Sequence, residues 1–172
     1  MSDAQRTGTE IIAACREAGF ADAGVCSCEP SDWGDAFRAW LARGEAGSMG
    51  YLSQHVETRL DPSRLLDHAR SVVMVADQYA SRDDPPDPPL GARHGRIARY
   101  ARGADYHVQI KKRLHTVCDK LRTAHPGHEF RAFTDTAPVL ERELAQRAGL
   151  GWVAKHTLLI SPRRGSYFFL GG

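Results

Sequence analysis

The feature that most constrains the fold is an apolar run near the middle of the chain. Residues 71–79, SVVMVADQY, are rich in apolar and β-branched side chains and show no regular alternation with polar ones. This pattern is typical of a strand that is buried on both faces. Such a strand needs cover on each side, so we predict a central sheet packed between helices.

Patterns of helical period lie on both sides of this run. Apolar residues at three- and four-residue spacing predict helices over residues 9–19 and 33–44. Asp105 is placed to cap a further long helix, and Pro138 is expected to open another that Gly149 closes. In the second helix four side chains share one face, which predicts that they pack in the core. They are Trp33, Phe37, Trp40 and Leu41.

Further strands are expected at three places. AGVCS and EFRAFTD each fit a short strand, and TLLIS and SYFFLGG flank PRRG as a hairpin. Residues 81–96 contain four prolines and have no periodicity, which indicates a surface loop. The sequence therefore predicts an α/β (α+β) fold, with helices and strands intermixed along the chain.

Length and composition are those of one globular domain. The 172 residues are 42% apolar and 26% charged, which excludes a disordered tail, a collagen or a repeat array. The formal charge of +2 is too small to indicate nucleic acid by itself. No window approaches 18 uninterrupted apolar residues and the N-terminus lacks the layout of a secretory signal, so we expect a cytoplasmic protein that makes no membrane contact.

The cysteines do not form a recognisable metal motif. In a reducing cytosol they are expected to remain thiols, and Cys26 and Cys28 have no second pair of ligands at matching spacing. The four are Cys15, Cys26, Cys28 and Cys118.

Asp135, in the string FTDTAP, is the first candidate for chemistry. It is expected at the carboxyl end of a strand and beside the start of a helix, an edge where open α/β sheets bind ligands. A carboxyl group in a partly dry cleft can keep a proton near neutral pH and act as a general acid. The alternative is that Asp135 merely caps the helix at Pro138.

Three other clusters carry polar side chains that suit a ligand. RYARGADYH places aromatic and charged groups close together before a helix, which suits a ligand site. The alternative is that these groups are solvated surface and a helix cap. In GLGWVAKHT, Lys155 and His156 could hold a phosphate or an amide edge, although no dinucleotide or P-loop motif is present. Arg59, in ETRLDP, could bind an anion or pair with Glu57 or Asp61.

Three long strings together resemble the epoxyqueuosine reductases over nearly the whole chain. They are MGYLSQHVETRLDPSRLL, RYARGADYH and FTDTAPVLERELAQRAGLGWVAKHTLLISPRRGSYFFLGG. The resemblance implies a nitroreductase-like three-layer domain with a central mixed sheet flanked by helices. It also implies a cobalamin-binding catalytic domain over residues 1–172, followed in the family by a ferredoxin-like domain with two [4Fe-4S] clusters. The family reduces epoxyqueuosine to queuosine at the wobble position of tRNA.

The resemblance also assigns roles to residues. Asp135 matches the proton donor, and Arg142 could face the same cleft and hold the acid or a substrate oxygen. Polar positions expected to reach the corrin amides or the nucleotide are Arg59, Lys155 and His156. Positions expected to flank the corrin are Ala98, Leu159 and Leu170. His107 lacks the glycine that would complete a D-x-H-x-x-G pattern, so we interpret it as a first-turn helix residue rather than a cobalt ligand.

The cysteines depart from the family pattern. Cluster ligation needs runs such as C-x2-C-x2-C-x3-C-P, and the four cysteines occur in none. Either a downstream segment with the clusters is absent from this chain, or the protein binds its cofactor without turnover. The expected partners are tRNA and cobalamin. The protein itself is expected to be a monomer. Two alternatives remain: a noncatalytic cobalamin-binding module and a flavin-dependent nitroreductase relative.

Overall fold

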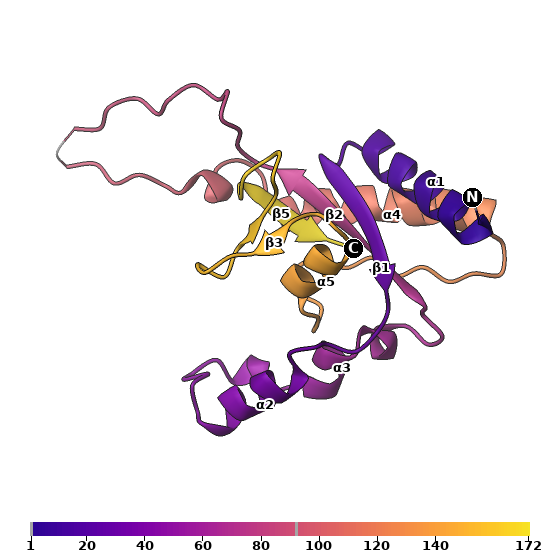
Figure 1. Ribbon diagram of the computed structural model, residues 1–172. Helices are drawn as coiled ribbons and strands as arrows, with labels where there is room; N and C mark the ends of the chain where they lie inside the picture. The colour runs from indigo at the N-terminus through magenta and orange to yellow at the C-terminus, as the bar shows by residue number, and fades with distance from the viewer. Residues whose placement is uncertain (1, 92) are drawn as a thin grey trace.

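The computed structural model describes residues 2–91 and 93–172. Its centre is a three-stranded sheet in the order β1–β2–β5, and a second, two-stranded sheet pairs β3 with β4 (Figure 1). The strands are β1 Asp22–Ser27, β2 Ser71–Gln78, β3 Trp152–Val153, β4 Leu159–Ile160 and β5 Phe168–Gly171. The mixed helix and strand content confirms the α+β class.

Helices cover both faces of the central sheet. Helices α1 (Asp3–Glu17) and α4 (Tyr106–Ala124) lie on one face, and α5 (Glu141–Arg147) contacts all three strands of the sheet. Val75 packs in a core cluster with residues of α1 and α4, whereas Met74 packs in another with residues of α5. Strand β2 is therefore buried on both faces, as its sequence predicted.

The central sheet is antiparallel rather than mixed. Both strand pairs, β1 with β2 and β2 with β5, are antiparallel. Ser27 at the end of β1 is the register partner of Ser71 at the start of β2, so residues 28–70 leave and return at the same end of the sheet. A parallel pair needs a connection that crosses to the other end. The mixed sheet that the resemblance implies is therefore not found among the described residues, because both connections within the central sheet return to the end that they leave.

Two predicted strands near the C-terminus pair differently. Residues 129–134 are extended but form no assigned strand, although Phe133 exchanges two backbone hydrogen bonds with Gly172. The prediction that the two strands flanking PRRG pair as a hairpin was wrong. Strand β4 pairs with β3, and β5 joins β2 in the central sheet. The one reciprocal bridge found inside the turn joins Ser161 and Gly165.

Helix boundaries differ from the expected ones at several ends. Helix α1 begins at Asp3, well before residue 9, because Ser2 and Gln5 form a capping box. Helix α5 begins at Glu141 rather than at Pro138.

The aromatic face of α2 (Gly34–Ala42) is not core: Trp33 is 63% exposed, and the other three side chains are half-buried outside both clusters. Helix α2 and the short α3 (Val56–Leu60) lie apart from the sheet (Figure 1), so the sheet does not cover that face.

The proline-rich segment is an excursion from the body, as predicted (Figure 1). Within it, Asp87 forms ion pairs with Arg96 at 2.7 Å and with Arg102 at 2.6 Å. These guanidinium groups hold the pKa of Asp87 well below its usual range.

Three short 3-10 helices complete the fold: Gly50–Leu52, Pro62–Leu65 and Arg99–Ala101. Within the described ranges, no helix is long and apolar enough to cross a membrane.

Candidate active site

Asp135 is the centre of a hydrogen-bonded cluster. The Tyr106 hydroxyl donates to Asp135 Oδ2 at 2.7 Å, and His107 Nε2 lies 3.0 Å from the same oxygen. Asp135 has a φ of +51°, the left-handed region that aspartate tolerates better than most residues. Its side chain is about half exposed, at 55%, so a ligand can reach it.

The start of α4 positions the two partners of Asp135. Asp105 caps this helix by accepting the His107 backbone N–H at 2.9 Å, and its Oδ1 also lies 2.8 Å from His107 Nδ1. The Tyr106 ring stacks on Phe169 of β5, with ring centroids 3.7 Å apart and planes at 3°. Helix capping and aromatic stacking thus fix both side chains before any ligand binds.

Glu141 supports Asp135 from the other side. The Asp135 backbone N–H donates to Glu141 Oε1 at 2.8 Å. Glu141 is the first residue of α5, and burial, helped by the nearby charge of Asp135, raises its pKa from an ordinary 4.5 to about 7. The sequence analysis missed this residue, because an acidic side chain in the first turn of a helix is commonplace.

The electrostatics allow the cluster to store and move protons. The carboxylates of Asp105 and Asp135 raise the pKa of His107, which favours the imidazolium between them. Burial and the hydrogen bond to Asp135 raise the pKa of Tyr106, so its hydroxyl stays a donor. The site combines the exposed carboxylate of Asp135, the imidazolium of His107 and the carboxyl group of Glu141. Such a combination suits general acid chemistry.

Glu141→Gln is expected to stabilise the protein at high pH. Because the folded state raises the pKa of Glu141, its contribution to stability is fully present below about pH 4.5 and is lost as pH rises through about 7. Glutamine can accept the same N–H without ionising. Glu141 is only partly buried, and solvent screening reduces the gain. We expect the variant to exceed the wild type by about 2 kcal/mol at pH 8 and by little at pH 4.5.

Urea unfolding at the two pH values measures this difference. Glu10→Gln, at an exposed glutamate of α1, is the matched control and should give the same small difference at both. An equal effect of Glu141→Gln at pH 4.5 and pH 8 would contradict the assigned burial of its carboxyl group.

Two alternative interpretations of site residues were wrong. Asp135 does not cap α5, whose N-cap is Leu140 with no side-chain cap. Arg59 pairs with neither Glu57 nor Asp61, because Arg38 and Arg64 bind these carboxylates instead. Arg59 Nε is buried without a hydrogen-bond partner in the described structure.

Other predicted site residues lie on α5 and in two exposed segments. Arg142 Nη1 donates to the Thr157 carbonyl at 2.5 Å and to its hydroxyl at 3.2 Å, in the turn between β3 and β4. Lys155 and His156 are exposed in the same turn, and Ala98 is exposed before the 3-10 helix at residues 99–101.

The two leucines predicted to flank the corrin pack inward. Leu159 is buried in the core cluster that includes α5, and Leu170 packs against it. A ligand could therefore reach Leu159 only through its backbone atoms, whereas the half-buried Leu170 keeps part of its surface accessible.

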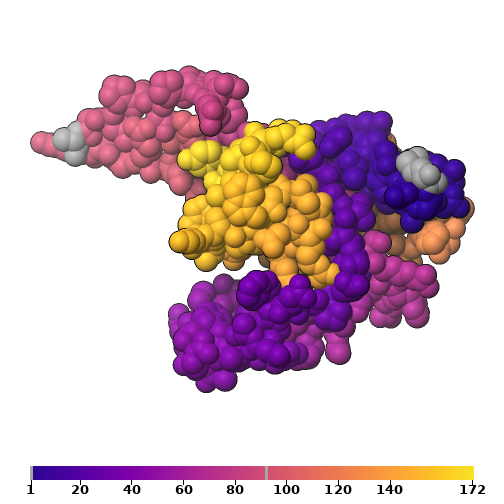
Figure 2. Space-filling view, viewed as in Figure 1, coloured from indigo at the N-terminus to yellow at the C-terminus, as the bar shows by residue number. Residues whose placement is uncertain are grey.

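Arg59 lines a small recess between α3 and α5. Glu143 and Arg147 of α5 lie on the opposite wall. The surface is hollowed between these segments in the space-filling view (Figure 2). Glu143 itself accepts hydrogen bonds from the Ser31 hydroxyl and the Asp32 N–H, which join α5 to the start of the α2 segment.

Comparison with known proteins finds one group of similar proteins. Residues 59–136 match the family described as epoxyqueuosine reductase QueG, DUF1730. An epoxyqueuosine reductase of Xanthomonas campestris is 38% identical over 171 residues, covering 98% of this chain and 48% of that protein. The chain is a homologue of the epoxyqueuosine reductases.

Solved epoxyqueuosine reductase structures share its fold. The enzyme of Streptococcus thermophilus superposes with a TM-score of 0.84 at 25% identity, covering 95% of this chain and 44% of that one. A structure with an epoxyqueuosine-modified tRNA-Tyr stem loop gives 0.77 at 29% identity, covering 98% and 45%. That of Bacillus subtilis, with an aspartate-bearing catalytic loop swung out of the active site, gives 0.80 at 28% identity, covering 98% and 45%.

The chain spans about half the length of the curated epoxyqueuosine reductases that it matches. The matched half includes Asp135 and its partners Tyr106, His107 and Glu141. The family model reaches the first three of these, and Glu141 lies just beyond it.

Proposed function

We propose that this chain is the half of an epoxyqueuosine reductase that supplies the proton donor, with epoxyqueuosine in a tRNA anticodon as substrate. The observation that carries the proposal is the Tyr106–Asp135–His107 cluster, in which one accessible carboxylate oxygen accepts two hydrogen bonds from α4. The family relationship supplies the reaction, and the catalytic aspartate loop described for the Bacillus subtilis enzyme supports the choice of residue.

Asp135 acts as the general acid in this proposal. Loss of the epoxide oxygen as water consumes two electrons and two protons, and a protonated oxygen leaves far more readily than a basic oxide. The proton comes from the imidazolium of His107, 3.0 Å from Asp135 Oδ2, which passes it to the carboxylate before Asp135 delivers it to that oxygen. Tyr106 holds the carboxyl group in place through its hydroxyl.

Cobalamin fits several features of this chain. Arg59 Nε is buried without a partner, and Lys155 and His156 offer exposed donors to amide groups at the edge of a corrin. Large apolar side chains close to Ala98 and His156 in the sequence are exposed and could cover the macrocycle. They are Ile97, Tyr100 and Leu158. When bound, cobalamin would supply the electrons for cleavage of the epoxide C–O bond.

Iron–sulfur clusters do not fit the described residues. Three of the four cysteines are buried and Cys28 is half-buried. Across residues 2–91 and 93–172, no group of three or more His, Cys, Asp or Glu is placed to hold a metal ion. We therefore assign any [4Fe-4S] clusters to the part of the relatives that this chain does not cover.

Titration with cob(II)alamin, followed by electron paramagnetic resonance, tests the cofactor assignment. We expect a saturable spectrum of cobalamin with its dimethylbenzimidazole base detached, and Arg59→Met should weaken binding about tenfold. Arg38→Met, at an arginine already paired with Glu57, is the matched control. No binding by the folded chain, or a flavin absorbance that copurifies, would overturn the assignment.

A further inference from the structure

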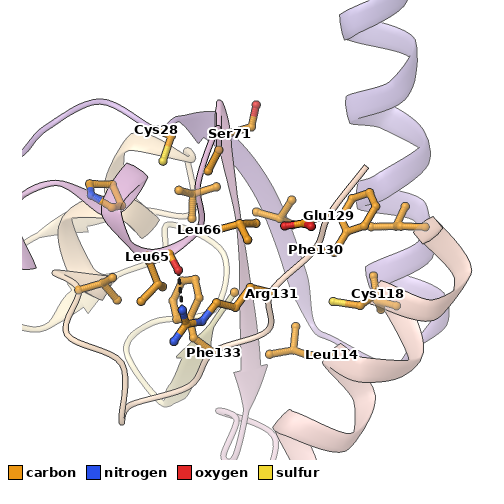
Figure 3. A pocket seen from close by; sticks show the side chains of 18 of the residues that line it. Cys28, Leu65, Leu66, Ser71, Leu114, Cys118, Glu129, Phe130, Arg131 and Phe133 are labelled. Carbon is orange, nitrogen blue, oxygen red and sulfur yellow. Dashed lines mark hydrogen bonds between the residues drawn. The ribbon is translucent and has the colours of Figure 1, made fainter. Parts of the chain in front are cut away.

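The chain that leads into Asp135 is fixed before it reaches that residue. The Arg131 side chain donates to the Leu65 carbonyl at 2.5 Å (Figure 3). Thr134 is 4% exposed, and its hydroxyl donates to the Leu170 carbonyl at 3.3 Å. The position of Asp135 is therefore set by the turn that follows Thr134.

Asp135 is the central residue of a tight three-residue turn. The Thr136 N–H donates to the Thr134 carbonyl, and Asp135 between them has a φ of +51°. Turns of this kind with a positive central φ are rare and strained. Such a conformation persists only where the surroundings hold it, and it is most common at functional sites. Contacts from outside the turn are thus needed to keep Asp135 in place.

Asp135 is held at two ends. Tyr106 and His107 of α4 bind Oδ2, at the tip of the side chain. Glu141 of α5 binds the other end, because its Oε1 accepts the backbone N–H of Asp135 at 2.8 Å. The contacts from α4 leave the backbone of the turn free to rotate, whereas the contact from α5 fixes it.

The carboxyl group of Glu141 is placed at a cost to stability. It is half-buried and lies near the carboxyl group of Asp135, as well as near Arg142 of its own helix and His107 of α4. A glutamine would accept the same N–H without a charge, and it is expected to be the more stable residue at high pH. A residue that lowers stability in this way is typical of a functional site.

We propose that Glu141 is a positioning residue for proton delivery. Its side-chain oxygen holds the backbone of Asp135, so that the Asp135 carboxylate stays in contact with Tyr106 and His107. Glu141 acts through Asp135 and touches neither the epoxide nor a cofactor. This role of Glu141 rests on the proposed function of Asp135, whereas the contact itself can be tested without turnover.

Glu141→Met and Glu141→Gln separate the hydrogen bond from the charge. Both variants replace the carboxylate by a neutral side chain of similar length, but only glutamine can accept the Asp135 N–H. NMR of this chain measures the amide exchange rate of Asp135 and the pKa of His107, which Asp105 and Asp135 raise together. In Glu141→Met we expect Asp135 to exchange about tenfold faster than in Glu141→Gln. We also expect a lower pKa of His107 in Glu141→Met, because the Asp135 carboxylate moves away from it.

A fusion of this chain to the portion of the Xanthomonas campestris relative that it does not cover links the contact to the reaction. With an epoxyqueuosine-modified tRNA stem loop, Glu141→Met should lower the single-turnover rate about tenfold, and Glu141→Gln should restore most of it. Urea unfolding of both variants checks that they are folded.

Equal Asp135 exchange rates and equal His107 pKa values in the two variants would overturn the positioning role, whatever reaction the protein performs. Equal single-turnover rates in the two fused variants, with Asp135→Asn inactive, would overturn it as well. A full rate in Asp135→Asn would instead refute the proposed function. The role of Glu141 in proton delivery would then fall with it, while the measured contact with Asp135 would stand.

Discussion

Asp135→Asn is expected to lower the rate of epoxide reduction by about 10²- to 10⁴-fold, the range that a positioned general acid contributes. Asparagine tolerates the left-handed backbone at this position, and its side-chain oxygen can still accept from Tyr106. It cannot deliver a proton to the departing oxygen. The loss is therefore expected in the chemical step, with cobalamin affinity nearly unchanged.

Single-turnover reduction of an epoxyqueuosine-modified tRNA stem loop measures this effect. The assay uses a fusion of this chain to the portion of the Xanthomonas campestris relative that it does not cover. Asp105→Asn is the matched control: Asp105 touches His107 but not the substrate side of the cluster, so a smaller loss is expected. A full single-turnover rate in Asp135→Asn would falsify the proton-donor assignment.

Gly24→Ala is expected to destabilise the protein by about 3 kcal/mol, the upper part of the range for overpacking a core. Gly24 is a buried residue of β1 against the end of α5, and an added Cβ would lie 2.1 Å from the Ala148 carbonyl oxygen. The neighbour is backbone, which cannot rotate away like a side chain. Either α5 or β1 must therefore move, and α5 carries Glu141.

Gly8→Ala is the matched control for that substitution. Gly8 lies within α1, and an added Cβ would meet nothing within 4 Å. Alanine is the better helix former, so this variant should gain up to about 1 kcal/mol. Urea unfolding of both variants measures the difference. If Gly24→Ala were as stable as Gly8→Ala, the close contact of β1 with α5 would be wrong.

Local patterns predicted much of the fold. The β-branched run at residues 71–78 forms the central strand, and the period of Ile110, Leu114 and Leu121 describes the buried face of α4. Asp105 caps α4 as its residue type indicated. These features depend on neighbours within a few residues, so the sequence contains the information needed to predict them.

Pairing and exposure were less predictable. The aromatic face of α2 has a core-like pattern, yet it is partly exposed because the helix lies apart from the sheet. The direction of the strands and the true partner of β4 depend on where the connecting segments return, which no single strand encodes. Asp135 was a candidate from its expected place between a strand and a helix and from the family motif, but its local context also allowed a helix cap.

The sequence by itself determined the α+β class, the central buried strand, the capped α4 and Asp135 as the candidate acid. Only the tertiary structure decided the antiparallel pairing and the contacts of Asp135 with Tyr106, His107 and Glu141. Local periodicity reports which side chains avoid water, whereas a proton site depends on distances between groups many residues apart. Tyr106 and Asp135 are 29 positions apart, and the packing of α4 beside β5 brings their oxygens to 2.7 Å.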